Sequence, residues 1–336
     1  MSAAPRLSLV VPVFNGAEHL PRFLAGLRAQ TLQEAEFILV DDGSTDASAA
    51  MLATFAANDS RASIVRQANA GPSQARNHGV SRARAPIVSF ADADDDVHPE
   101  FCEALERRLR EERLDVAYCN GRRIDAHGIP HARPLIRTRA DGEVSSGADW
   151  IASAVARDDF VHAPWLLACT APLARRTPFP VGIIHEDIPW TCELLLGAPR
   201  VGFIARELYG YRSTPHSLMR EPSVGARQRR IDGYFEVVRL LLAMAARADV
   251  PANARCALRR HAADQAPNVF RFARLLPGTR ERLSVRARAG RMHLPALMWR
   301  EARSLAERRR AARACISSLA ARIALAGARE TSGEPR

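Results

Sequence analysis

Apolar runs of strand length alternate with helical patterns over the first 120 residues, and this alternation limits the fold more than any other feature. The expected strands are residues 7–14, 36–40, 63–66, 85–88 and 114–120. Apolar residues three and four apart predict helices between them, over 18–30, 46–57, 73–84 and 99–113. A strand–helix repeat of this kind builds a mixed, mainly parallel sheet flanked by helices. We therefore expect an α/β domain.

Polar clusters follow three of these strands. Asn15 follows the first strand, Asp41 and Asp42 the second, and an acidic cluster of Asp92, Asp94, Asp95 and Asp96 the fourth. Ligands of open α/β sheets bind outside the carboxyl ends of the strands. We therefore expect these polar residues to line one crevice.

The acidic cluster places four carboxylates within five positions. Carboxylates this close raise one another's pKa unless a positive charge sits among them. Oxygen ligands with no neighbouring cysteine favour Mg²⁺ or Mn²⁺, with phosphates and water completing the shell. A solvated acidic turn is the alternative, because turns also favour Asp.

The charge of the chain is unevenly distributed. All 48 basic residues are Arg, which excludes a Walker-type lysine loop, Schiff-base chemistry and a lysine base. Residues 225–336 carry 24 Arg against 9 acidic residues, whereas residues 1–224 carry 24 Arg against 28. We expect two domains, 1–224 with the α/β sheet and 225–336 as a basic α-helical region with helices at 231–246, 252–275 and 297–325.

The six cysteines are scattered, which predicts reduced thiols and no disulfide framework. We expect neither a signal peptide nor a membrane-spanning helix, and therefore a cytoplasmic protein. The basic C-terminal region could contact an anionic membrane surface on the inner face of the cytoplasmic membrane, or it could present solvated helix faces. No aromatic residues interleave its Arg clusters, so we expect no nucleic-acid partner.

Six motifs, in order along residues 6–220, resemble the family 2 glycosyltransferases, which have a GT-A fold. They are VVPVFNG at 10–16, VDDGSTD at 40–46, AGPSQARNHG at 70–79, DADD at 92–95, Glu186-Asp187, and Tyr211-Arg212 with Ser217. The resemblance implies a nucleotide-diphospho-sugar donor, with a UDP-linked sugar expected.

The resemblance also assigns roles on the donor side. It implies that Asp42 contacts the base and that Pro12, Phe14, Asn15, Arg76 and Asp92 line the nucleotide-sugar site. Asp92 and Asp94 form the D-x-D pair, and Asp94 is expected to ligate Mn²⁺ or Mg²⁺ directly. Turn chemistry is the alternative for Asp42, and a solvated helix position is the alternative for Arg76. We expect Asn77 to hold loop backbone, and Asp95 or Asp96 to cap the helix at 99–113.

The acceptor side follows from the second acidic pair. Inverting transfer needs a carboxylate that removes a proton from the acceptor hydroxyl, and we assign this role to Asp187. Glu186 and Trp190 are expected beside the acceptor, a glycan or a lipid-diphosphate-linked glycan. The alternative for Glu186 and Asp187 is helix capping, and the alternative for Trp165 and Trp190 is core packing. We expect His185 to be structural.

The predicted function is therefore a metal-dependent, inverting glycosyltransferase of cell-surface polysaccharide synthesis. Two other classes remain open at this point. One is a sugar-1-phosphate nucleotidyltransferase, which would need a Gly-rich basic loop and a lysine that the chain lacks. The other is a non-catalytic nucleotide- or polyanion-binding protein.

Overall fold

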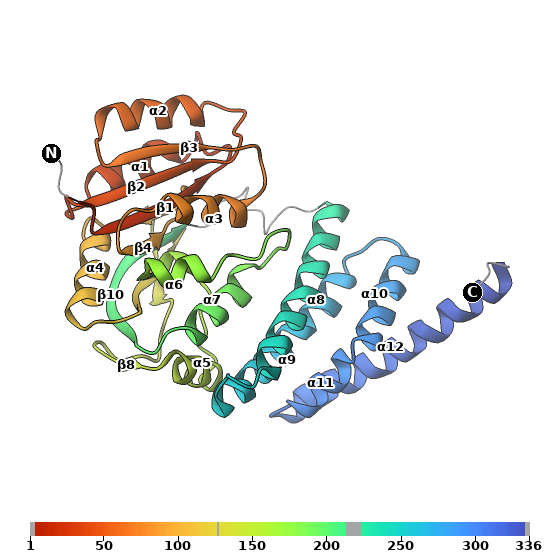
Figure 1. Cartoon of the computed structure of the whole chain (residues 1–336). Helices are drawn as coiled ribbons and strands as arrows, with labels where there is room; N and C mark the ends of the chain where they lie inside the picture. The colour runs from red at the N-terminus through yellow and green to blue at the C-terminus, as the bar shows by residue number, and fades with distance from the viewer. Residues whose placement is uncertain (1–3, 126–127, 213–222, 333–336) are drawn as a thin grey trace. The chain divides into compact units, whose positions relative to one another are not determined.

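A computed structural model describes residues 4–125, 128–212 and 223–332, and it divides the chain into two compact units (Figure 1). The first unit is Met1–Gly182 with Trp190–Ser217, and the second is Ile183–Pro189 with Leu218–Arg336. The segment Ile183–Pro189, which we expected to belong with the sheet, therefore groups with the C-terminal helices. Ser217 of the family pattern lies outside the described residues.

A ten-stranded sheet forms the centre of the first unit in the described part of the chain. Its strands are β1 (Leu7–Val13), β2 (Ala35–Asp41), β3 (Ala62–Arg66), β4 (Ile87–Phe90), β5 (Asp96–Val97), β6 (Val116–Ile124), β7 (Pro130–Pro134), β8 (Val144–Ser145), β9 (Leu167–Thr170) and β10 (Val201–Arg212). The order is β3-β2-β1-β4-β9-β6-β10-β5, with β7 on β6 and β8 on β10. The first four strands in this order pair in parallel, whereas β9 pairs antiparallel with both β4 and β6. The expected mixed, mainly parallel sheet is confirmed for this half.

The helices of the first unit are α1 (Leu20–Arg28), α2 (Ser48–Asn58), α3 (Pro72–Arg82), α4 (Phe101–Glu111), α5 (Gly147–Ala156) and α6 (Ala171–Arg176), with a 3-10 turn, η1, at Pro164–Leu166. Helix α7 (Asp187–Leu196) belongs to the first unit from Trp190 onward, whereas its first three residues group with the second unit. Helix α3 approaches β1 closely, because a Cβ on Gly79 would lie 2.3 Å from Val10 Cγ1. Only glycine permits that approach, so the backbone of α3 packs directly on β1.

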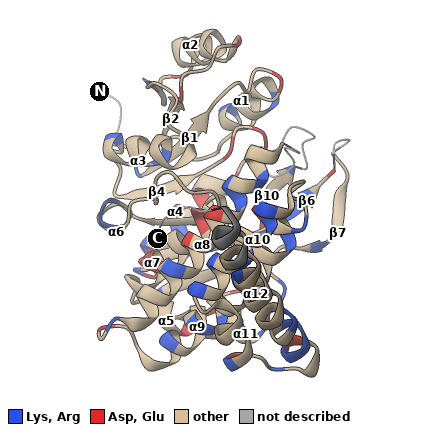
Figure 2. Ribbon diagram, turned by 90° about the vertical axis from the view of Figure 1, so that its right-hand side faces the viewer, with Lys and Arg blue, Asp and Glu red and all other residues tan. Residues whose placement is uncertain are grey.

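The second unit contains α8 (Val224–Ala246), α9 (Ala252–Ala273), α10 (Thr279–Arg291), α11 (Leu294–Arg300) and α12 (Leu305–Ser332). Helix α8 packs on α9, and α12 packs on α10 and α11. Their arginines are coloured blue in Figure 2. Across the described residues, no helix has the length and apolar character needed to cross a bilayer.

One helix of this unit was missed from the sequence, and another was predicted wrongly. Helix α10 was not predicted, because it is rich in Arg and buries only Val285, Ala287 and Ala289. The single helix expected at 297–325 is broken between α11 and α12. Ser304 accepts a hydrogen bond from the Glu307 N–H at 3.2 Å, while Glu307 accepts one from the Arg303 N–H at 2.7 Å. This reciprocal pairing resembles a capping box and starts a new helix.

Candidate active site

The carboxyl ends of β1, β2 and β4 lie at one edge of the sheet. Strand β1 is the parallel neighbour of both β2 and β4, so the polar residues that follow the three strands share that edge. Figure 2 colours the acidic residues red. The expected crevice at the strand ends is thus compatible with the observed topology.

Asn15 shapes the loop after β1. Its backbone has a positive φ of 47°, and its Oδ1 accepts a hydrogen bond from the Thr45 N–H at 2.8 Å. The Asn15 N–H donates in turn to Ser44 Oγ at 3.1 Å. These bonds join the loops after β1 and β2, while the side chain of Phe14 is 50% exposed and that of Pro12 is half-buried.

Asp42 organises the loop that leads into α3. Its Oδ1 accepts hydrogen bonds from Gln67 Nε2 at 2.8 Å and from the Ala70 N–H at 2.9 Å, and its Oδ2 accepts one from the Gly71 N–H at 2.9 Å. The residue is 3% exposed. A carboxylate offers about four lone-pair sites, so three are already used by the protein. Asp42 therefore does organise the turn, which was the alternative to a base contact. Its contact with the base of the nucleotide stays a prediction.

Arg76 lies on α3 and is 6% exposed, so the alternative of a solvated helix residue is wrong. Its Nη2 donates to Asp92 Oδ1 at 2.8 Å, and its guanidinium lies 5.3 Å from the centre of the Phe179 ring. Asn77 binds the backbone of Phe179 in both directions, at 2.8 and 2.9 Å. The expectation that Asn77 holds loop backbone is confirmed.

Asp95 is fully buried and binds the end of β10. Its Oδ2 accepts a hydrogen bond from the Tyr209 hydroxyl at 2.9 Å, and its Oδ1 accepts one from the Arg212 N–H at 2.7 Å. Burial, followed by the nearby charges of Asp92 and Asp94, raises the pKa of the Asp95 carboxyl well above its ordinary value. The expectation that Asp95 caps the next helix is therefore wrong.

Asp96 also binds residues of other helices and strands, and not those of α4. It pairs with Arg22 of α1 and with Arg212 of β10, at 2.6 Å in both cases. Helix α4 has no side-chain cap, so the expected capping by Asp96 is wrong too. We expected one of the two residues to cap the following helix, whereas both bind segments that are far apart from them in the chain.

Two carboxylates of the acidic cluster thus remain to be considered as metal ligands, Asp92 and Asp94. The side chain of Asp92 is 28% exposed, and Asp94 is half-buried with its backbone carbonyl bound by Arg22 Nη2 at 2.7 Å. Within the described chain, the acidic cluster does not bring three carboxylates within a common ligand distance. A pair of carboxylates fits Mg²⁺ or Mn²⁺ when the oxygens of a diphosphate complete the shell.

The second acidic pair lies in the segment that groups with the second unit. Asp187 begins α7, and its Oδ1 accepts a hydrogen bond from the Ile188 N–H at 3.0 Å, so the capping alternative has a physical basis. His185 has a φ of 69°, and its ring packs on Tyr234 at 4.2 Å between centroids. Burial, with smaller contributions from Arg230 and Arg271, lowers the pKa of His185 to about 4.

The acceptor-side role expected for Trp190 is not supported. Trp190 is 1% exposed, stacks on Phe179 at 4.0 Å between centroids, and donates its Nε1–H to the Thr177 carbonyl at 2.9 Å. Core packing, the alternative, is confirmed. Trp165 is stacked between Tyr209 and Tyr211, with centroids 4.6 and 5.2 Å away.

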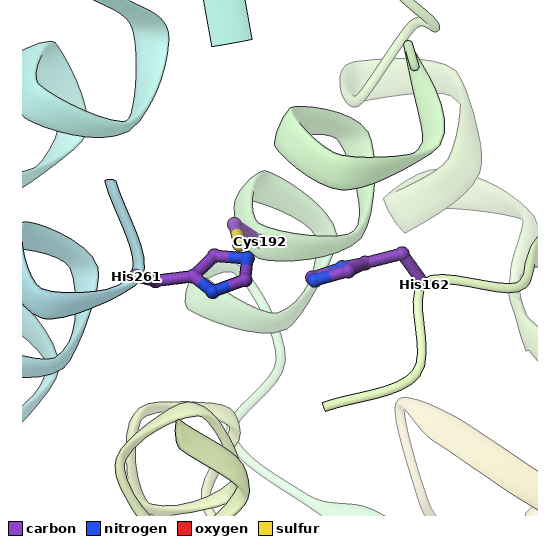
Figure 3. A group of neighbouring side chains, drawn as sticks. All are labelled: His162, Cys192 and His261. Carbon is purple, nitrogen blue, oxygen red and sulfur yellow. The ribbon is translucent and has the colours of Figure 1, made fainter. Parts of the chain in front are cut away.

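Figure 3 shows the side chains of His162, Cys192 and His261. His162 and Cys192 belong to the first unit, whereas His261 belongs to α9 of the second. Neither unit by itself supplies all three groups, and we assign no metal to them.

The sequence interpretation missed three contributors to the strand-end site. Gln67 holds Asp42, Tyr209 holds Asp95, and Arg22 holds Asp96. Tyr209 was the one with a signal, because it lies two residues before the recognised Tyr211-Arg212 pair and therefore on the same face of the strand as Tyr211.

Comparison with known proteins places the chain among the glycosyltransferases. Residues 8–145 match the family described as glycosyl transferase family 2. The glycosyltransferase YibD of Escherichia coli is 31% identical over 246 residues, which cover 72% of this chain and 71% of YibD. The glycosyltransferase EpsJ of Bacillus subtilis is 27% identical over 69% of this chain and 68% of EpsJ.

Two solved structures share the fold. The crystal structure of Staphylococcus aureus TarS 1–349 in complex with UDP-GlcNAc has a TM-score of 0.65 at 18% identity, covering 95% of this chain and 92% of that one. The mannosyltransferase PcManGT of Pyrobaculum calidifontis, in complex with GDP-Man and Mn²⁺, has a TM-score of 0.54 at 14% identity, covering 95% and 88%. The expected GT-A fold is confirmed, and the nucleotidyltransferase and non-catalytic alternatives are set aside. The chain belongs to glycosyltransferase family 2.

Proposed function

We propose that this glycosyltransferase is a metal-dependent, inverting enzyme that moves a sugar from a UDP-linked donor to a glycan or a lipid-diphosphate-linked glycan, in cell-surface polysaccharide synthesis. The observation that carries the proposal is the Arg76–Asp92 ion pair, next to Asp94, at the edge shared by the ends of β1, β2 and β4. A guanidinium and paired carboxylates in this arrangement suit a metal-bound diphosphate.

The donor site would be built from the loops at that edge. Asp42 holds the loop 67–71 and would face the base with its remaining lone pair, and Asn15 ties the two loops together. Pro12 and Phe14 would flank the nucleotide, since the Phe14 ring is exposed. The complexes of TarS with UDP-GlcNAc and of PcManGT with GDP-Man support a nucleotide-sugar donor, and we take UDP from the first.

Asp94, together with Asp92, would hold Mn²⁺ or Mg²⁺. When bound, such an ion neutralises the diphosphate and stabilises it as a leaving group. Arg76 keeps Asp92 in place through its 2.8 Å ion pair and adds a second positive charge at the same position. The Mn²⁺ in the PcManGT complex supports this choice of ion.

Asp187 would act as the general base. Its carboxylate would accept the proton of the acceptor hydroxyl while the hydroxyl oxygen forms a bond to the anomeric carbon. The bond between that carbon and the diphosphate oxygen breaks, and the nucleoside diphosphate leaves with the electron pair. Attack opposite to the leaving group inverts the anomeric centre. Glu186 would orient the acceptor.

Acceptor and location follow from the charge of the second unit. The Arg-rich helices would favour an acceptor that carries phosphate, such as a lipid-diphosphate glycan, at the inner face of the cytoplasmic membrane. This part of the proposal is independent of the donor chemistry.

A donor-binding screen tests the proposal. The full chain is titrated with UDP-sugars and GDP-sugars, with and without Mn²⁺, while thermal unfolding is followed. We expect stabilisation by at least one UDP-sugar that increases with Mn²⁺ and is lost with EDTA. Stabilisation by a GDP-sugar alone would overturn the UDP assignment, and no stabilisation by any nucleotide-sugar would overturn the proposed reaction.

A further inference from the structure

Helix α12 packs with its small side chains inward and its large apolar side chains outward. The residues that it buries are Ala311, Ala314, Ser318 and Ala321. Ser318 lies against Gly290 of α10, so the contact with the neighbouring helix is made by small groups. A helix of a globular protein normally turns its large apolar residues to the core, so this orientation indicates that the outer face has another partner.

The outer face carries an aliphatic stripe. Leu305 is 64% exposed, Ile316 70%, Leu319 59% and Ile323 65%. Ile316, Leu319 and Ile323 follow one another at intervals of three and four residues, and Leu305 precedes Ile316 by eleven, which is close to three turns. All four side chains therefore lie along one face.

Arginines border this stripe. The exposed arginines of α12 are Arg308, Arg309, Arg310, Arg313 and Arg322, and among the described residues none of the five has an ion-pair partner. Glu307 is the one acidic residue of the helix up to position 326, and it is held by Arg260 of α9 at 2.9 Å. The exposed part of α12 therefore combines large aliphatic groups with an excess of positive charge.

We infer that the outer face of α12 docks on a lipid bilayer that contains anionic lipids. The aliphatic stripe would enter the boundary between headgroups and acyl chains, and the guanidinium groups would bind lipid phosphates. Helix α12 would lie in the plane of the surface.

Charge complementarity favours this occupant over others. In a two-fold dimer built on this face, the five arginines of one copy would meet the same five of the other. A nucleic acid would find arginines but no exposed aromatic side chain on α12 for base stacking, and the aliphatic stripe would gain nothing from it. An anionic bilayer offers acyl chains to the aliphatic stripe and phosphates to the arginines.

Vesicle co-sedimentation of the full chain tests this inference, with phosphatidylcholine vesicles that contain or lack phosphatidylglycerol. One variant combines Ile316→Gln, Leu319→Gln and Ile323→Gln, and a second combines Arg309→Gln and Arg313→Gln. The matched control is Ile129→Gln with Val181→Gln, two exposed apolar positions of the first unit. Far-UV circular dichroism and thermal unfolding confirm that each variant folds.

We expect binding only to vesicles with phosphatidylglycerol, decreasing as salt is added. Each α12 variant should bind about tenfold more weakly, while the control binds like wild type. Equal binding to neutral vesicles, or unchanged binding of the triple variant, would overturn the inference. So would a triple variant that changes only the oligomeric state in light scattering, which would identify a second copy as the occupant.

The inference can be separated from the proposed transfer reaction. The triple variant should retain donor hydrolysis in solution, whereas Asp94→Asn should lose turnover and keep vesicle binding. Loss of both properties in the folded triple variant would count against a separate membrane surface.

Discussion

The hydroxyl of Tyr209 donates a hydrogen bond to Asp95 Oδ2 at 2.9 Å, although the two residues lie 114 positions apart. The same hydroxyl accepts a hydrogen bond from the Asp92 N–H at 3.0 Å. Burial, followed by the nearby Asp95 and Asp92, raises the pKa of Tyr209 well above its ordinary value, so the phenol keeps its proton. The buried side chain of Tyr209 thereby holds both Asp92, at the start of the acidic cluster, and Asp95, the residue next to Asp94.

Tyr209→Phe should therefore weaken the metal site while keeping the aromatic core. The variant loses two buried hydrogen bonds, which predicts a loss of about 1–3 kcal/mol in the free energy of unfolding. It should also need more Mn²⁺ for half-maximal turnover, because the backbone of Asp92 is no longer held.

Tyr118→Phe is the matched control for this experiment. Tyr118 is also fully buried, but its hydroxyl has no hydrogen-bond partner in the described part of the chain. Its removal should leave the Mn²⁺ requirement unchanged. An equal change in both variants would show that Tyr209 acts through packing alone.

Asp94→Asn and Asp187→Asn should separate donor binding from proton transfer. Asp94→Asn should weaken Mn²⁺-dependent donor binding by about tenfold or more, since a metal ligand is lost. Asp187→Asn should bind the donor like wild type and lose about 10²–10⁴ in turnover, the usual contribution of a general base. Calorimetric titration and a transfer assay measure the two effects.

The control for that pair is Glu207→Gln, which breaks only the exposed ion pair with Arg122. It should change neither quantity. Equal losses of donor affinity in Asp94→Asn and Asp187→Asn would contradict the division of roles.

Asp42→Asn should loosen the loop before α3. The Asn side chain has one acceptor oxygen, so it cannot receive the hydrogen bonds that now reach both oxygens from Gln67, Ala70 and Gly71. We expect a loss of about 1–3 kcal/mol in the free energy of unfolding, measured by urea titration, with weaker binding of the donor. Hydrogen exchange at the Ala70 and Gly71 amides should become faster, and unchanged exchange would refute the role of Asp42 in holding the loop.

The protein should lose stability on acidification through His261. Burial lowers the pKa of His261 from 6.5 to about 4, so the unfolded state takes up a proton at a higher pH than the folded state. The associated stability is present above pH 6.5 and is lost as the pH falls toward 4, by up to about 3 kcal/mol.

His261→Gln should reduce this dependence when unfolding is compared at pH 7 and pH 5, while His185, whose pKa is also lowered to about 4 by burial, keeps its own contribution. His131→Gln, at an exposed position of β7, should keep the wild-type slope. A wild-type slope in His261→Gln would assign the acid sensitivity to other groups.

The sequence was most informative about local structure in the first 120 residues. Strand and helix alternate there because apolar runs with turn residues specify local structure, and β1, β2 and β4 were found close to the expected positions. The motifs also identified the family. Asp42, Asp92 and Asp94 follow strands whose ends the topology brings to one edge, and Arg76 of α3 pairs with Asp92 there. The break before α12 also has a sequence signal, because Ser304 is followed three residues later by Glu307, the pattern of a capping box.

The alternation of elements, the polar residues after the parallel strands and the excess of arginine in the C-terminal region can be read directly from the amino acids. Three features could not be read in this way: Asp95 binds Tyr209 instead of capping a helix, Trp190 fills the core, and α12 turns Ile316 and Leu319 outward. Propensity and periodicity act over a few neighbouring residues, whereas the partner of a buried carboxyl or the covered face of a helix is set by packing between segments distant in the chain.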